Sequence, residues 1–116
     1  MGVENRRAMR VNAAFYVKLG CDVAESKKKW EENIAKNVSE CGLAITTSYC
    51  YPQNSILTLL LRIPTQQTLD WVEASGKVID CTKIMDNAYI TRIDFIDLHP
   101  SIKEAIKRYV EWASTK

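Results

Sequence analysis

The sequence has little that would support catalysis or metal binding. Its single histidine, His99, precedes Pro100 at the expected start of a helix, where a turn or capping role is favoured over a catalytic one. No paired carboxylates, no nucleophile beside a base and no cluster with metal-ligand spacing stand out. We therefore expect a protein that is not an enzyme and that holds no metal.

Two further absences bear on the cellular compartment. The four cysteines include no Cys-x-x-Cys pair, and no signal peptide argues for disulfides. We expect reduced, partly buried thiols, and their role stays open: Cys21, Cys41, Cys50 and Cys81. No run approaches the ~20 apolar residues that a membrane helix needs. The chain is most simply cytoplasmic, without a membrane span.

The positive charge of the chain is concentrated at its N-terminus. The 116 residues carry a formal net charge of only +2, yet Arg6, Arg7 and Arg10 all fall near the start. We expect residues 1–10 to form a flexible arm and residues 11–116 to form a single domain with its own core. A basic arm on a near-neutral body favours a small anionic ligand over nucleic acid, which usually requires a broader basic face.

Alternating apolar and polar residues predict strands through most of the chain. The expected strands cover residues 11–19, 30–38, 43–48, 56–63, 69–81 and 89–97. Residues 21–29 are expected to form a solvated loop, in which the role of Lys27–Lys29 stays open. Gly76, in the middle of a strand, suggests a bulge or a barrel corner. Short strands at this spacing predict a mainly β protein, a small six-stranded antiparallel β-barrel.

The alternation also predicts which side chains point inward. Trp30, Ile34 and Val38 are expected to share one face of their strand. Three aromatic residues lie in strand patterns typical of the core: Phe15, Trp71 and Phe95. A barrel that binds RNA or single-stranded nucleic acid would instead expose aromatic rings on one sheet face for base stacking. This class of protein is disfavoured and stays an alternative.

One helix is predicted at the C-terminal end, over about residues 100–114. Ser101 and Glu104 have the spacing of a capping box just after Pro100. The apolar residues that follow recur at helical spacing, so one stripe faces the rest of the protein. We expect this helix to plug one end of the barrel or to lie along its side.

A polar turn between two predicted strands is the best candidate for a binding site. It contains Asn37, Ser39 and Gly42, and the arginine-rich arm precedes it. An amide and a hydroxyl offer neutral hydrogen bonds, whereas arginines offer charged forks that fit phosphates and guanine edges. Taken singly, the amide and hydroxyl are typical turn formers that bond their own backbone, and the glycine is typical of a hairpin. Together, the arm and the turn predict a site for an anionic purine nucleotide.

The two halves also resemble a known family signature. Arg6-x-x-x-Arg10 followed by Asn37-x-Ser39-x-x-Gly42 is similar to the two-part motif of PilZ domains, which are receptors for the bacterial second messenger cyclic di-GMP. The resemblance implies a six-stranded barrel whose N-terminal arm clamps the ligand against the turn. It implies that these five residues contact the ligand, and Arg7, inside the motif, is a further candidate contact.

The resemblance further implies a receptor or adaptor that requires no cofactor besides its ligand. Binding would change the conformation of the arm, and a partner protein would pass the signal to motility, exopolysaccharide or biofilm control. The identity of that partner and the number of ligand molecules bound, one or two, stay open. The alternatives are a PilZ-like scaffold that no longer binds the nucleotide and the RNA-binding or single-strand-binding barrel described above.

Overall fold

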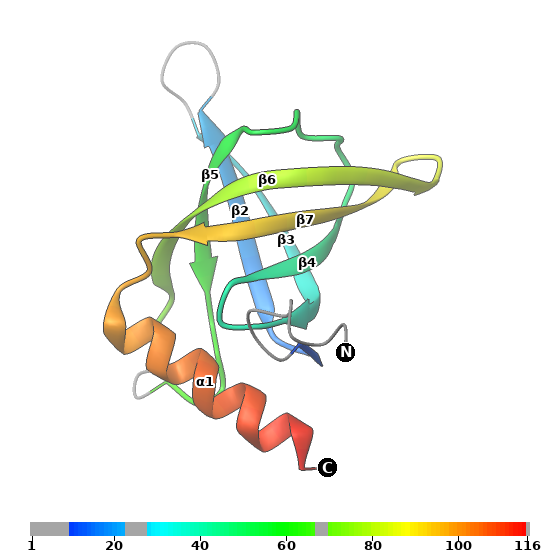
Figure 1. The fold of residues 1–116 in the computed structure, drawn as a ribbon. Helices are drawn as coiled ribbons and strands as arrows, with labels where there is room; N and C mark the ends of the chain where they lie inside the picture. The colour runs from blue at the N-terminus through cyan, green and yellow to red at the C-terminus, as the bar shows by residue number, and fades with distance from the viewer. Residues whose placement is uncertain (1–9, 23–27, 67–69, 116) are drawn as a thin grey trace, which may run out of the picture.

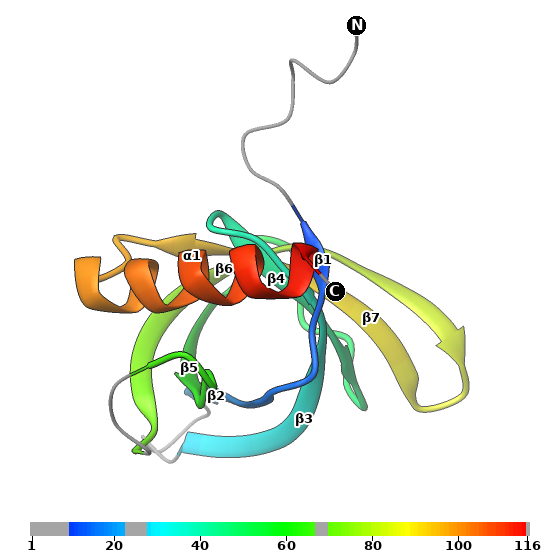
Figure 2. The ribbon, with the colours of Figure 1, turned by 90° about the horizontal axis from the view of Figure 1, so that it is seen from below.

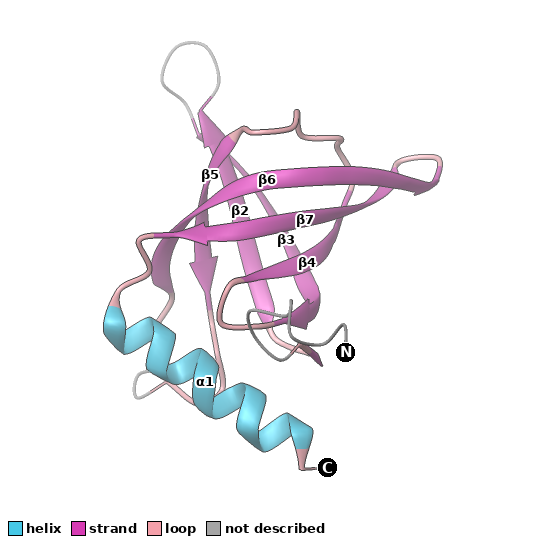
Figure 3. Cartoon of the chain, in the orientation of Figure 1, coloured by secondary structure: helices cyan, strands magenta, loops and turns pink. Residues whose placement is uncertain are grey.

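The computed structural model describes residues 10–22, 28–66 and 70–115 of the chain. Strands dominate these residues and a single helix follows them (Figures 1 and 3). The elements are β1 (Val11–Asn12), β2 (Tyr16–Asp22), β3 (Lys28–Val38), β4 (Gly42–Thr47), β5 (Ile56–Leu61), β6 (Val72–Met85), β7 (Ala88–Ile96) and α1 (Pro100–Ser114). The predicted mainly β class is confirmed.

The strands form one antiparallel sheet that closes on itself. Neighbouring strands follow the order β1-β3-β2-β5-β6-β7-β4, and β4 pairs back with β3. Strands β2 to β7 therefore form the predicted six-stranded barrel, and the short β1 is an extra strand beside β3. Figure 2 looks into the barrel from the end where α1 lies. Among the described residues, each of the strands β2 to β7 therefore has a neighbour on both sides, which removes from the barrel the open strand edges that promote aggregation.

The core is built from alternate side chains of the barrel strands and from one face of α1. Large apolar side chains fill the interior: Leu19, Leu43, Ile45, Leu57, Leu59, Leu61, Ile63, Ile93 and Ile106 are fully buried. Phe15 is buried as predicted, and Phe95 is partly buried against the core. The prediction for Trp71 is wrong, because its ring lies under the cations of Lys18 and Arg62, which are 4.6 and 5.4 Å from its centroid.

The first predicted strand, residues 11–19, is interrupted. Its two ends form β1 and β2, and its predicted apolar alternation is retained. At the break, the amide of Ala14 leaves the strand ladder and donates to the hydroxyl of Tyr109, at a distance of 3.0 Å. The interruption thus docks α1 against the N-terminal segment, a contact over 95 positions that strand periodicity does not reveal.

The predicted shared face of β3 is wrong. The side chains of Trp30 and Ile34 are 45% and 49% exposed, whereas Val38 is fully buried. The cause is a register shift in the pairing with β4 between Ala35 and Asn37. An extra residue at such a bulge reverses the alternation beyond it and redirects side chains. The bulge therefore lies at the head of the candidate binding turn.

The hairpin of β6 and β7 is longer than predicted and has its bulges elsewhere. Register shifts occur between Val78 and Asp80 and between Lys83 and Met85, so a bulge at Gly76 is wrong. A Cβ atom at Gly76 would lie 2.4 Å from Cγ2 of Ile93, so this glycine makes room for the packed interior.

The helix begins two residues earlier than the capping-box prediction implies, which would make Ser101 the N-cap. His99 is the N-cap, and its Nδ1 accepts a hydrogen bond from the amide of Ser101 at 3.1 Å. Ser101 therefore lies in the first turn, and Glu104 accepts from Nε of Arg108 at 3.2 Å instead of returning to the cap. The predicted capping box is wrong, whereas the capping role predicted for His99 is confirmed.

Replacing Tyr109 with phenylalanine is expected to lower the free energy of unfolding by about 1 kcal/mol, because the Ala14 amide loses its acceptor. Thermal unfolding should show a decrease in Tm of about 4 °C. Tyr16→Phe is the matched control, since Tyr16 is exposed and its ring lies outside the core. An unchanged Tm for Tyr109→Phe would contradict a stabilising role for this hydrogen bond.

Candidate functional site

The turn between β3 and β4 is held rigidly by its own hydrogen bonds. The amide of Ser39 donates to the carbonyl of Gly42 at 2.8 Å, and the Ser39 hydroxyl accepts from the amide of Cys41 at 3.1 Å. The carbonyl of Cys41 accepts from the amide of Phe95 at 2.8 Å, which fixes the turn to β7. Ser39 is only 2% exposed, so its side chain points inward and supports the turn backbone.

Gly42 is required by strand packing. A Cβ atom at this position would lie 2.1 Å from the carbonyl oxygen of Ile93 and 3.0 Å from Cα of Asp94. Among the described residues, positive φ angles occur at Asn54, Asn87 and Asp97, so Gly42 does not supply a left-handed torsion. Its lack of a side chain lets β4 approach β7 closely at the point where the turn begins.

The arm and the turn meet at Arg10 and Asn37. Nη1 of Arg10 donates to Oδ1 of Asn37 at 3.1 Å, across 27 positions of sequence. The pairing of β1 with β3 brings them together, because Val11 lies opposite Val38. The Asn37 amide is therefore directed toward the arm and does not cap its own backbone. Arg6 and Arg7 lie outside the described residues.

A hollow of about 250 Å³ adjoins this turn on the side of β7 and α1. We call it the turn hollow, and Glu40, Cys41, Asp94, Phe95, Leu98 and Lys103 line it. The register pair of Gly42 with Asp94 brings β7 beside the turn. Sequence analysis missed Asp94 as a neighbour of the turn, because the pairing of β4 with β7 joins strands far apart in sequence and no local pattern signals it.

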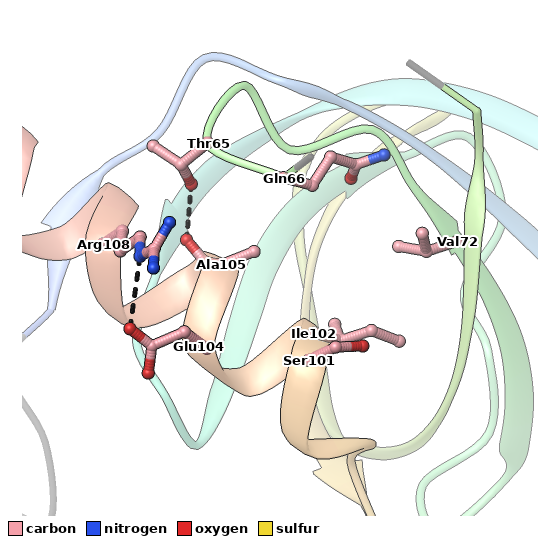
Figure 4. A pocket seen from close by; sticks show the side chains of 8 residues that line it. All are labelled: Thr65, Gln66, Val72, Ser101, Ile102, Glu104, Ala105 and Arg108. Atoms are coloured by element: carbon pink, nitrogen blue, oxygen red, sulfur yellow. Dashed lines mark hydrogen bonds and ion pairs between the residues drawn. The ribbon is translucent and has the colours of Figure 1, made fainter. Parts of the chain in front are cut away.

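A second hollow, of about 300 Å³, lies on another face of α1 (Figure 4). The hydroxyl of Thr65 donates there to the carbonyl of Ala105, and Glu104 pairs with Arg108 at the rim. Its charged groups are thus paired with each other, and its lining contains none of the residues predicted to contact a ligand. The turn is the better candidate site.

Other ionisable groups are engaged in structural contacts. Nε of Arg92 lies 3.0 Å from each carboxylate oxygen of Asp80, and these hydrogen bonds lower the pKa of the Asp80 carboxyl. Cys41 and Cys81 are half-buried thiols, as predicted, whereas Cys50 is exposed. Within the described part of the chain, no three metal-ligating side chains gather, and no helix is long and apolar enough to cross a membrane.

The chain is similar to known proteins both in its sequence pattern and in its fold. The sequence profile of the PilZ domain matches residues 4–112. The inhibitor of motility of Bacillus subtilis (MotI/DgrA) superposes with a TM-score of 0.78 at 15% identity, over 96% of this chain and 52% of that one. The PilZ domain of YcgR from Escherichia coli, solved with cyclic di-GMP, gives 0.68 at 11% identity, over 96% and 92%.

The complex of K. pneumonia MrkH with cyclic di-GMP superposes with a TM-score of 0.61 at 14% identity, over 97% of this chain and 56% of that one. The chain thus spans about half the length of MotI and MrkH. No curated protein matches it in sequence. At these identities, the structural likeness establishes the shared barrel fold.

Proposed function

The chain belongs to the PilZ domain family, and from this premise we propose that it is a receptor for cyclic di-GMP that binds the nucleotide between its N-terminal arm and the β3–β4 turn. The observation that carries the proposal is the 3.1 Å hydrogen bond between Arg10 and Asn37. It joins the two halves of the family motif at one point of the surface.

Each motif residue has a role that its chemistry suits. Arg6, Arg7 and Arg10 supply planar cations for the phosphates and for the Hoogsteen edges of the guanines. The Oδ1 atom of Asn37 accepts from a guanine N–H group. Ser39 and Gly42 act through the turn, which they hold in a single shape against β7.

Ligand binding requires the Arg10–Asn37 contact to open or to be shared. This contact is exposed, so its net contribution to stability is small, about 1 kcal/mol. Charge-assisted bonds to phosphate are stronger, which makes the exchange favourable. The arm thereby changes its position on binding, and the altered surface is what a partner protein recognises.

The output of the receptor depends on that partner. MotI is described as an inhibitor of motility, and MrkH as a transcription regulatory factor dependent on cyclic di-GMP. For this chain we propose a protein partner in motility, exopolysaccharide or biofilm control, in the cytoplasm, without catalysis of its own. The formal net charge of only +2 favours a protein partner over DNA.

Isothermal titration calorimetry with cyclic di-GMP tests the proposal directly. We expect a Kd in the micromolar range or below, about −8 kcal/mol or better. GTP is the control, since it carries one guanine and lacks the cyclic diester. The molar ratio at saturation distinguishes one bound ligand from two. A folded protein that releases no heat with cyclic di-GMP would contradict the receptor and favour the scaffold.

A further inference from the structure

We propose that the turn hollow takes one guanine base of the bound dinucleotide and selects guanine over adenine through the carboxylates of Asp94 and Glu40. The inference rests on the proposed function. It adds residues outside the family motif and assigns them a role in base specificity.

The turn hollow has a fixed position relative to the motif residues. Asp94 lies directly opposite Gly42 in the pairing of β7 with β4, and the amide of Phe95 donates to the carbonyl of Cys41. Glu40 belongs to the turn itself, between the motif positions Ser39 and Gly42. A ligand held by the arm and the turn therefore has this hollow at its side.

The charges of the hollow favour a base over a phosphate. Glu40 and Asp94 bring two carboxylates to its lining, and a phosphate beside them would be repelled. Guanine presents adjacent N1–H and N2–H donors, which a carboxylate accepts, and next to them the O6 acceptor, which suits the ammonium of Lys103. Adenine has an acceptor at N1, a donor at N6 in place of O6 and no amino group at C2, so it cannot offer a carboxylate the two adjacent donors of guanine and it places a donor where guanine offers O6 to the lysine.

The remaining walls and the size of the hollow agree with a single base. Phe95 and Leu98 are half-buried and give an apolar surface on which a flat ring can pack. The volume, about 250 Å³, is below the 300–1,000 Å³ of pockets that enclose whole drug-sized ligands. One base fits there while the phosphates stay with Arg10.

The selectivity is supplied by groups other than the motif amide. Asn37 is neutral and its Oδ1 already accepts a hydrogen bond from Arg10, so it is a weak acceptor for the N–H donors of guanine. The carboxylates of the turn hollow provide the negative charge that such donors prefer.

The test is calorimetry of the wild-type chain and of Asp94→Asn and Lys103→Ala with cyclic di-GMP and cyclic di-AMP. We expect the wild type to prefer cyclic di-GMP by at least about 100-fold. Asp94→Asn should lose ~10- to 100-fold in affinity for cyclic di-GMP and much less for cyclic di-AMP. Lys103→Ala should lose about fivefold for cyclic di-GMP only.

Matched controls lie nearby on the same elements. Asp97→Asn removes an exposed carboxylate outside the hollow, at a positive φ of 46° that asparagine tolerates. Lys107→Ala removes an exposed lysine one turn further along α1. Both controls should bind as the wild type does. Wild-type binding with unchanged affinity and selectivity in Asp94→Asn would overturn this inference alone, whereas no binding by the folded wild type would overturn the proposed function with it.

Discussion

Arg10→Ala is expected to weaken the binding of cyclic di-GMP by about 30-fold to several thousandfold. The estimate corresponds to roughly 2–5 kcal/mol for the loss of one partner in a charged hydrogen-bonded pair, at 1.4 kcal/mol for each factor of ten. Arg10 is exposed, and its side chain donates to Asn37 at the surface, so the fold should be unaffected. Calorimetry gives the affinity, and thermal unfolding without ligand verifies that the variant is folded.

Two further variants make this result specific. Arg10→Lys keeps the charge and removes the fork, so it should recover only part of the lost affinity. Arg108→Ala removes an exposed arginine at the other hollow of α1, where it pairs with Glu104, and should bind normally. Wild-type affinity in Arg10→Ala, or equal losses in Arg10→Ala and Arg108→Ala, would contradict a specific role for Arg10.

Among substitutions that add one methyl group to the barrel, Gly42→Ala is expected to be the most destabilising. It should lower the free energy of unfolding by about 3 kcal/mol or more. The added Cβ would lie 2.1 Å from a backbone oxygen of Ile93, so two hydrogen-bonded strands would have to separate. Denaturant unfolding without ligand measures the change, which should appear as a lower midpoint at an unchanged m-value.

The chain offers a matched control for this substitution. At Gly20 the three atoms nearest to an added Cβ all belong to the half-exposed ring of Trp30, the nearest 2.6 Å away, so a side chain would have to shift and the strand backbone would not. Gly20→Ala should therefore lower the free energy of unfolding by about 1 kcal/mol or less. If Gly42→Ala unfolds like the wild type yet fails to bind, the glycine serves close approach of the ligand and strand packing is not its main role.

The barrel and the end of the chain were predictable because their signals are local. Period-two alternation located six strands, and the helical stripe that follows Pro100 located α1. Arg10 and Asn37, from the two halves of the motif, form a hydrogen bond beside the short pairing of β1 with β3. The ligand roles of Arg6, Arg7, Ser39 and Gly42 stay predictions for the binding experiments to decide.

The features that sequence did not reveal depend on long-range register. The bulge beside Asn37 places Trp30 and Ile34 on the opposite face of β3 from Val38, and no residue type in the sequence predicts this bulge. The Ser39 hydroxyl points inward because it accepts a hydrogen bond from the amide of Cys41 within the turn. Asp94 reaches the turn only because the barrel closes between β4 and β7.

The short strand β1 also fixes the point at which the arm joins the barrel. Because Val11 is paired with Val38, the arm is tethered beside its target, and Arg6 has a reach of roughly 13–14 Å from Arg10. A tether of this length keeps the arginines at millimolar effective concentration over the turn. In the proposed mechanism, closure of the arm over the ligand is therefore an intramolecular step, and the ligand concentration alone controls the response.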